Sequence, residues 1–210
     1  MHRLRASSRR GAEPTHWLER LRRRSQDERG VAVLEAAIIT PIFFTLILGV
    51  AEIGLAMNDY LALAATVRAG ARVASASGND GYADYGILSA VERESAAIER
   101  KKIQYIVVYK PSTFGEKPSA TCQAGTPVAN VCNVYTVSDF SRPKSDFGCR
   151  NDLNLDRYWC PNARNVTITG TGTDYVGVWM KVKHPWLTKM FGADKMLTDQ
   201  SVIRLEPRQR

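Results

Sequence analysis

Histidine is scarce in this sequence of 210 residues, and its scarcity argues against hydrolytic chemistry. His2 and His16 lie in a basic N-terminal stretch, so His184 alone remains as a candidate base, and Pro185 follows it directly. A serine or cysteine hydrolase needs such a base beside its nucleophile. GxSxG, HExxH and phosphate-binding glycine-loop motifs are also lacking. We therefore expect no catalytic residues and no cofactor, and a structural role for His184.

Spacings that would indicate a metal site are lacking too. The segment NDLNLD sets Asp152, Asn154 and Asp156 as in a calcium loop, but Arg157 and Ala163 occupy the positions that need glycine and glutamate. We expect a solvated turn there and no metal. The four cysteines do not form the closely spaced pairs typical of zinc sites, so a zinc site is the less favoured alternative.

Positive charge is concentrated at one end of the chain. The formal net charge is +8, and residues 1–30 contain nine Arg against four Asp or Glu, which leaves +3 for the rest. No aromatic residues alternate with a basic stripe, so we expect no nucleic-acid partner. Residues 1–30 instead resemble a cytoplasmic basic leader beside a membrane segment.

Residues 31–57 form an almost uninterrupted apolar run. As a helix the run would be about 40 Å long at roughly 1.5 Å per residue, enough to cross a hydrocarbon core of about 30 Å. A buried core helix and a cleaved secretory signal are the alternatives, and the run is longer than the usual apolar part of such a signal. Arginines cluster before it, which predicts a single-pass membrane protein, in contact with lipid, with its N-terminus inside the cell.

All four cysteines fall in the part that this orientation exports, where disulfides persist. Four cysteines allow three connectivities. We favour the two that close short loops, Cys122 with Cys132 and Cys149 with Cys160.

The rest of the chain predicts an α+β fold. The membrane helix is expected to continue as a rod to about Ser77, with Gly70 as a weak point, and a second helix to cover residues 87–101. Residues 58–101 would then be an extracytoplasmic helical region, and residues 102–210 a strand-rich domain with a small, mostly antiparallel sheet and two disulfides. Strands are predicted at residues 103–110, 133–138, 165–169, 174–183 and 201–207.

Two patterns within this domain predict packing. In residues 174–183, period-two spacing places Val176, Val178, Met180 and Val182 on one face and Trp179 on the other. Apolar residues at helical spacing then predict a short helix ended by Gly192 and packed on the sheet, with an interfacial or subunit contact as the alternative. These residues are Trp186, Leu187, Met190 and Phe191.

A carboxylate, Glu35, interrupts the apolar run. An ionisable residue in a membrane segment is costly and usually functional, although Glu35 lies near one end and can reach the interface. The stretch RGVAVLE, with Gly30 directly before the run, resembles the processing site of type IV prepilins and pseudopilins. The resemblance implies that a prepilin peptidase cuts between Gly30 and Val31. The Glu35 carboxylate would then offset the new Val31 ammonium, in the same or a neighbouring subunit.

A longer segment is similar to the TadE-like family of tight-adherence pilus assembly proteins. The markers are Glu35, Pro41, Glu52 within AEIG, and AATVRAGAR after the apolar run, while the last residues resemble the family's C-terminus more loosely. Ala69 follows Arg68 where the family usually has glutamate, which leaves the role of Arg68 open. Pro41 removes one helical hydrogen bond, and we expect it to kink the helix.

The resemblance implies a minor pseudopilin-like protein required to assemble a tight-adherence type IV pilus. Its partners would be a prepilin peptidase, other pilin or pseudopilin subunits, the assembly machinery and membrane lipid. It would be the substrate of an enzyme and not an enzyme itself. The alternatives are an uncleaved, membrane-anchored extracytoplasmic binding protein and an anchored hydrolase.

Overall fold

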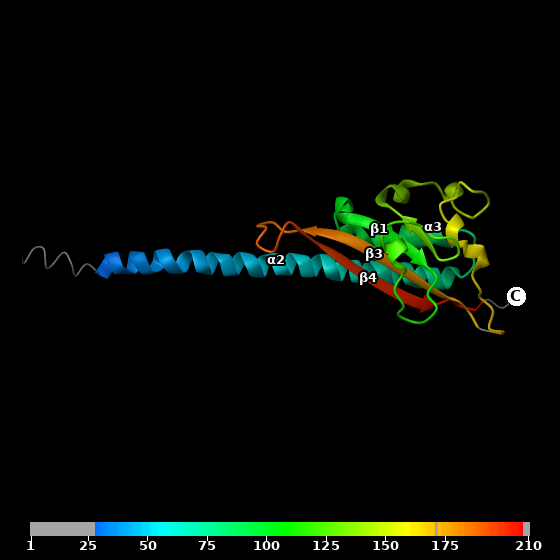
Figure 1. Cartoon of the computed structure of the whole chain (residues 1–210), viewed down its shortest axis with the longest axis horizontal. Helices are drawn as coiled ribbons and strands as arrows, with labels where there is room; N and C mark the ends of the chain where they lie inside the picture. The colour runs from blue at the N-terminus through cyan, green and yellow to red at the C-terminus, as the bar shows by residue number, and fades with distance from the viewer. Residues whose placement is uncertain (1–27, 171, 208–210) are drawn as a thin grey trace, which may run out of the picture. The chain divides into compact units, whose positions relative to one another are not determined.

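The structure is a computed structural model that describes residues 28–170 and 172–207. It comprises two compact units, Met1–Leu48 and Gly49–Arg210. Predictions for the basic leader up to residue 27 lie outside the described residues. Figure 1 shows the helices and strands along the chain.

One long helix, α2, runs from Glu28 to Ser77 and contributes to both units. Its sequence is rich in alanine and leucine, which have high helix propensity. The helix ends where Gly78 adopts a positive φ of 59°, and the Gly78 N–H donates to the Ala74 carbonyl at 3.2 Å. A glycine in this conformation is a common helix terminator. The predicted long N-terminal helix and its end near Ser77 are confirmed.

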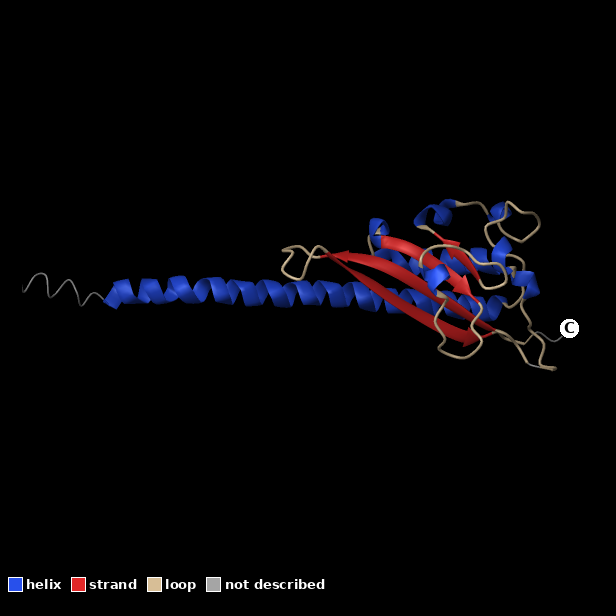
Figure 2. Cartoon of the chain, in the orientation of Figure 1, coloured by secondary structure: helices blue, strands red, loops and turns tan. Residues whose placement is uncertain are grey.

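Four antiparallel strands form one sheet in the order β2-β1-β3-β4. Its longest pairing is the hairpin of β3 and β4, which Figure 2 shows in red. The strands are β1 (Ile103–Tyr109), β2 (Cys132–Tyr135), β3 (Tyr175–Pro185) and β4 (Asp194–Arg204). The small antiparallel sheet of an α+β fold is therefore as predicted, although β4 begins seven residues before the expected position.

Strand β3 is buried on both faces of the sheet. Val176, Val178, Met180 and Val182 belong to the main core with side chains of α2 and α3 (Ala83–Glu94), as the period-two pattern predicted. Trp179 lies in a second cluster on the other face, with Val107, Tyr109, Val202 and the Cys122–Cys132 pair. Apolar contacts on both faces fix the register of the strand, because a shift of one residue would exchange the two sets.

Shorter helices lie in the segments that connect α2, β1, β2 and β3. The second long helix begins at Ala83 and ends at Glu94, about four residues before the predicted start and seven before the predicted end. Ser95 follows, and its hydroxyl donates to the Glu92 carbonyl at 3.1 Å, a local bond that competes with helix continuation. The remaining short helices are α4 (Ala120–Gln123) and the 3₁₀ turns Ser95–Ala97, Arg100–Lys102, Val137–Ser141, Lys144–Asp146, Arg157–Trp159 and Pro161–Ala163.

One disulfide joins α4 to the first residue of β2, and a second closes a loop between β2 and β3. The Sγ atoms of Cys122 and Cys132 lie 1.99 Å apart, and those of Cys149 and Cys160 lie 2.15 Å apart. This is the short-loop pairing favoured from the sequence. Each bridge closes a loop of about ten residues, and a loop of this size stabilises a fold by roughly 3 kcal/mol in the chain-entropy model.

Two predicted elements were wrong. Residues 165–169 form no strand, because the Asn165 side chain accepts hydrogen bonds from the Thr167 N–H and hydroxyl, and this local turn replaces extended pairing. The helix predicted around Trp186 is instead the loop between β3 and β4. Lys189 and Gly192 have positive φ values of 59° and 103° there, which a continuous α-helix cannot contain.

Gly70 lies at a close approach between α2 and the rest of the core. A Cβ atom at this position would lie 2.9 Å from Cγ2 of Val91 and 3.3 Å from Cγ1 of Val178. Both neighbours are β-branched side chains that are fully buried, so neither can move aside easily. The position is therefore a close packing contact, and not merely the weak point that helix propensity predicts.

We predict that Gly70→Ala destabilises the protein. Overpacking a dense core costs about 1–3 kcal/mol, which outweighs the gain of up to about 1 kcal/mol from helix propensity. Thermal unfolding of the detergent-solubilised full chain measures the effect. Gly86→Ala in α3 is the matched control, because its Cβ would lie 3.5 Å from Val73 in ordinary contact. We expect the control to leave the midpoint unchanged or to raise it, and an equal rise for Gly70→Ala would contradict the packing argument.

Candidate functional site

The first part of α2 presents apolar side chains on all sides. Leu34, Ile38 and Phe43 are 64%, 61% and 57% exposed, and no part of the most apolar 18-residue window of Gly30–Ser77 is buried. Among the described residues this is the one helix long and apolar enough to cross a membrane. The alternative of a buried core helix is therefore wrong.

Gly30, Val31 and Glu35 lie at the start of this helix. A Cβ atom at Gly30 would meet no atom within 4 Å, and Val31 is 67% exposed. Glu35 follows Val31 by four positions, so both lie on the same face, about one helical turn apart. Among residues 28–170 and 172–207, no hydrogen-bond or ion-pair partner faces the exposed Glu35 carboxylate, so it is available to a group outside the described chain.

Pro41 lies within α2, and the helix continues through it. The Thr45 hydroxyl donates to the Pro41 carbonyl at 2.7 Å, as threonine side chains often do in membrane helices. Because proline has no N–H, the Ala37 carbonyl lacks its usual helical donor. The kink at Pro41 stays a prediction.

Glu52 is a buried carboxylate of α2, with 2% of its surface exposed. Its Oε1 atom accepts a hydrogen bond from the Thr188 N–H in the loop between β3 and β4, while Oε2 is buried without a partner among the described residues. The same loop crosses Gly49, where a Cβ atom would lie 3.9 Å from Phe191 and 4.0 Å from Met190. Figure 2 shows this loop beside α2.

Asp59 lies two turns further along α2 and links three elements. Its Oδ2 atom is 2.9 Å from Lys102 Nζ and 2.6 Å from Nδ1 of His184, which lies near the end of β3. Asp59 and His184 are each 4% exposed. The histidine is thus held by a carboxylate and contacts the Trp186 ring at 5.0 Å, which agrees with the structural role expected for it.

A buried ion pair joins α3 to the loop that precedes β3. Arg164 donates to Asp84, and both side chains have no exposed surface. Asp84 also accepts from Asn133 at 2.8 Å and from the Tyr135 hydroxyl at 2.7 Å. Burial, together with the neighbouring Asp84 carboxylate, raises the pKa of Tyr135 well above its ordinary value. The tyrosine therefore stays protonated and acts as a donor to Asp84.

The NDLNLD segment is stabilised by its own side chains. Asn154 Oδ1 accepts from the Arg150 and Asn151 N–H groups, and the Asp156 carboxylate accepts from the N–H groups of Gly148 and Cys149. Burial raises the pKa of Asp156, while its bond to Gly148 acts in the opposite direction. Both Asn154 and Asp156 are buried, so the expected solvated turn is wrong in this respect. The described residues contain no cluster that could hold a metal.

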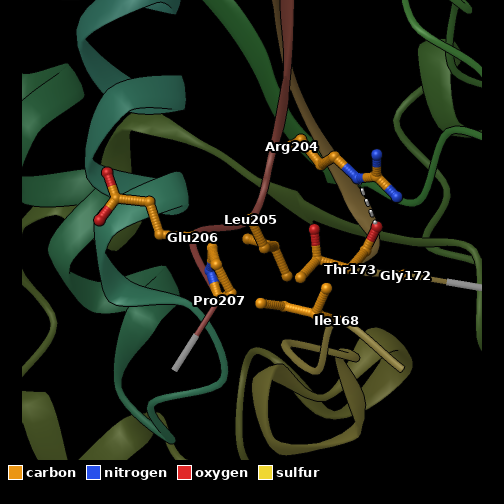
Figure 3. A pocket seen from close by; sticks show the side chains of 7 residues that line it. All are labelled: Ile168, Gly172, Thr173, Arg204, Leu205, Glu206 and Pro207. Atoms are coloured by element: carbon orange, nitrogen blue, oxygen red, sulfur yellow. Dashed lines mark hydrogen bonds between the residues drawn. The ribbon is translucent and has the colours of Figure 1, made fainter. Parts of the chain in front are cut away.

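A recess of about 460 Å³ lies where β4 ends (Figure 3). Arg204 is the one cation among the described residues that line it; its Nε donates to the Thr173 carbonyl at 3.2 Å, and its guanidinium lies over the Tyr175 ring. The lining residues are Ile168, Gly172, Thr173, Arg204, Leu205, Glu206 and Pro207.

Comparison with known proteins bears on α2. Residues 30–72 match the TadE-like protein family. No curated protein and no solved structure matches the chain. The family match confirms the resemblance inferred from the sequence, and it begins at Gly30 and ends at Arg72 within α2.

TadE-like proteins are assembly components of the tight-adherence pilus, so the match implies involvement in assembly of that pilus. The matched segment contains both Glu35, which is exposed, and Glu52, which is buried. Sequence reasoning named Glu52 only as a family marker and missed Asp59 and Asp84. A charged residue on the apolar side of a helix is the signal that could have found them.

We predict that Glu52→Ala loosens the loop between β3 and β4, whereas Glu52→Gln leaves it nearly intact. A glutamine oxygen can still accept from the Thr188 N–H, but alanine leaves this donor without a partner, at a cost of about 1–3 kcal/mol. Hydrogen exchange of residues 186–193 in the detergent-solubilised chain measures the difference. Equal protection of the loop in the alanine variant and the wild type would show that the contact does not hold it.

Proposed function

We propose that this protein is a minor pseudopilin-like subunit required for assembly of a tight-adherence type IV pilus, and that a prepilin peptidase processes it after Gly30. The family match carries the proposal, because it begins at Gly30, the glycine of α2 that directly precedes the apolar run 31–57. The protein is anchored by α2 with its N-terminus in the cytoplasm and its disulfide-containing unit outside. We assign it no catalytic role.

The role that we assign to Glu35 follows from the charge that cleavage creates. Cleavage between Gly30 and Val31 gives Val31 a free ammonium at the start of an apolar helix. Glu35 lies about one turn away on the same face and has no partner among the described residues. When α2 packs against other helices in an assembly, this ammonium needs a carboxylate, and Glu35 of the same or a neighbouring subunit supplies one.

Cleavage after Gly30 is the first test of the proposal. In a host that expresses a prepilin peptidase, intact-mass spectrometry of the membrane-extracted protein should detect a chain that begins at Val31. We expect Gly30→Leu to abolish this product, because a bulky side chain would not fit a peptidase site that accepts glycine. Gly54→Leu is the matched control, since a Cβ at Gly54 also meets nothing within 4 Å, and it should be cleaved normally. Intact chains in the peptidase-positive host would favour the uncleaved binding protein instead.

A second prediction separates cleavage from assembly. Glu35→Gln should leave insertion and cleavage largely unchanged, because the apolar residues and Gly30 are untouched. It should reduce piliation and co-purification of partner subunits at least tenfold, since loss of one member of a buried charge pair costs roughly 3–5 kcal/mol. Glu94→Gln, which neutralises an exposed carboxylate of α3, is the control and should assemble normally. Normal piliation by the Glu35 variant would leave this carboxylate as a tolerated interfacial residue.

A further inference from the structure

The loop between β3 and β4, residues 186–193, exposes large apolar side chains together. Leu187, Met190 and Phe191 are 74%, 45% and 48% exposed. Trp186 is half-buried and contacts the Phe191 ring at a centroid distance of 5.1 Å. Exposed apolar groups gathered in this way indicate an interaction surface. We refer to residues 186–193 as the hairpin tip.

The tip is held in place and does not depend on a partner for its shape. Its backbone closes through hydrogen bonds from Trp186 to Ala193 and from Gly192 to Lys189, at 3.3 and 3.1 Å. The Thr188 N–H donates to Glu52 of α2. A surface that is ordered before it binds loses little conformational entropy on binding.

The position of the tip along α2 identifies what it contacts. A span of about 20 residues crosses a hydrocarbon core, so a segment that begins at Val31 reaches the far side of the core near Val50. The tip contacts α2 at Gly49 and Glu52, which lie on either side of Val50 and therefore close to the far side of the core. Val50 and Ile53 are themselves 72% and 53% exposed, so the tip and this part of α2 offer adjacent apolar surfaces at one level.

The charges of the tip fit a headgroup layer. Residues 186–193 contain one cation, Lys189, and no Asp or Glu. Lys189 and the nearby Lys195 are exposed, whereas Lys183 is paired with Asp194 at 2.8 Å. Tryptophan and lysine are enriched at membrane interfaces, where an apolar body enters the acyl region and a polar group remains among the headgroups.

We propose that the hairpin tip is an interfacial anchor that inserts into the headgroup and acyl boundary of the bilayer crossed by α2. In this position Leu187, Met190 and Phe191 contact lipid, and these contacts hold the exported unit at the membrane surface. Glu52, buried beneath the tip, is thereby shielded from lipid. The inference requires that α2 spans the bilayer, but it is independent of cleavage and of any role in a pilus.

The test uses an environment-sensitive fluorophore on the full-length chain. The label is attached to Leu187→Cys and, as a matched control, to Leu153→Cys, because Leu153 is an 86% exposed leucine in the 149–160 disulfide loop. Each protein is reconstituted in vesicles of phosphatidylethanolamine and phosphatidylglycerol. The quenchers are lipids spin-labelled near the headgroup and aqueous iodide present on both sides. Met190→Cys provides a second tip position if the Leu187 variant does not fold.

We expect spin-labelled lipid to reduce the tip fluorescence by at least about twofold relative to the Leu153 control, with iodide showing the reverse order, as insertion at the interface requires. Equal quenching by iodide at both positions, without lipid quenching at the tip, would overturn the proposal. A tip protected from both quenchers would overturn it as well, because another protein or a second copy would then cover the surface.

Discussion

The continuity of α2 is the constraint on which the rest of the structure depends. A single helix of 50 residues must be apolar on every side in its first part and apolar mainly toward the sheet in its second. Alanine, leucine and valine suit both parts of the helix. In the second part, however, the helix backbone must also lie close to the side chains that pack against it. Gly70 permits that approach, because the absence of a Cβ lets Val91 and Val178 contact the helix backbone.

Buried carboxylates mark the change from one environment to the other. Glu52 and Asp59 lie on α2, and each is bonded to a group at the end of the β3–β4 hairpin or beside it. A buried charge is tolerated when a partner satisfies it. These contacts therefore fix the hairpin along α2, and they determine which apolar side chains are left exposed at its tip.

The arrangement separates two kinds of carboxylate on one helix. Glu52 is buried and accepts a hydrogen bond at Oε1 from the unit Gly49–Arg210, while the exposed Glu35 has no partner among residues 28–170 and 172–207. A helix that carries an unpaired carboxylate near its start and an ordered unit after it is suited to lateral packing with other helices. This is compatible with the involvement in pilus assembly that the TadE-like match implies.

The sequence by itself determined the long helix, the antiparallel sheet, the two faces of β3 and the short-loop disulfides. These features follow from local signals, such as an unbroken apolar run or period-two alternation, that do not depend on distant residues. The same kind of signal failed at Trp186 and its apolar neighbours. Their helical spacing is real, but pairing of β3 with β4 over eleven residues each leaves these neighbours only the connecting loop.

Only the tertiary structure decided the partners of the buried charges and the role of Gly70. Asp59 meets His184 across a separation of 125 residues, and Asp84 meets Arg164 across 80. No local pattern encodes such pairs, because they arise when separate elements pack and leave each carboxylate without water. Gly70 has a low helix propensity. Only the packing of α2 against α3 and β3 shows why glycine stands there, because a Cβ would come too close to Val91 and Val178.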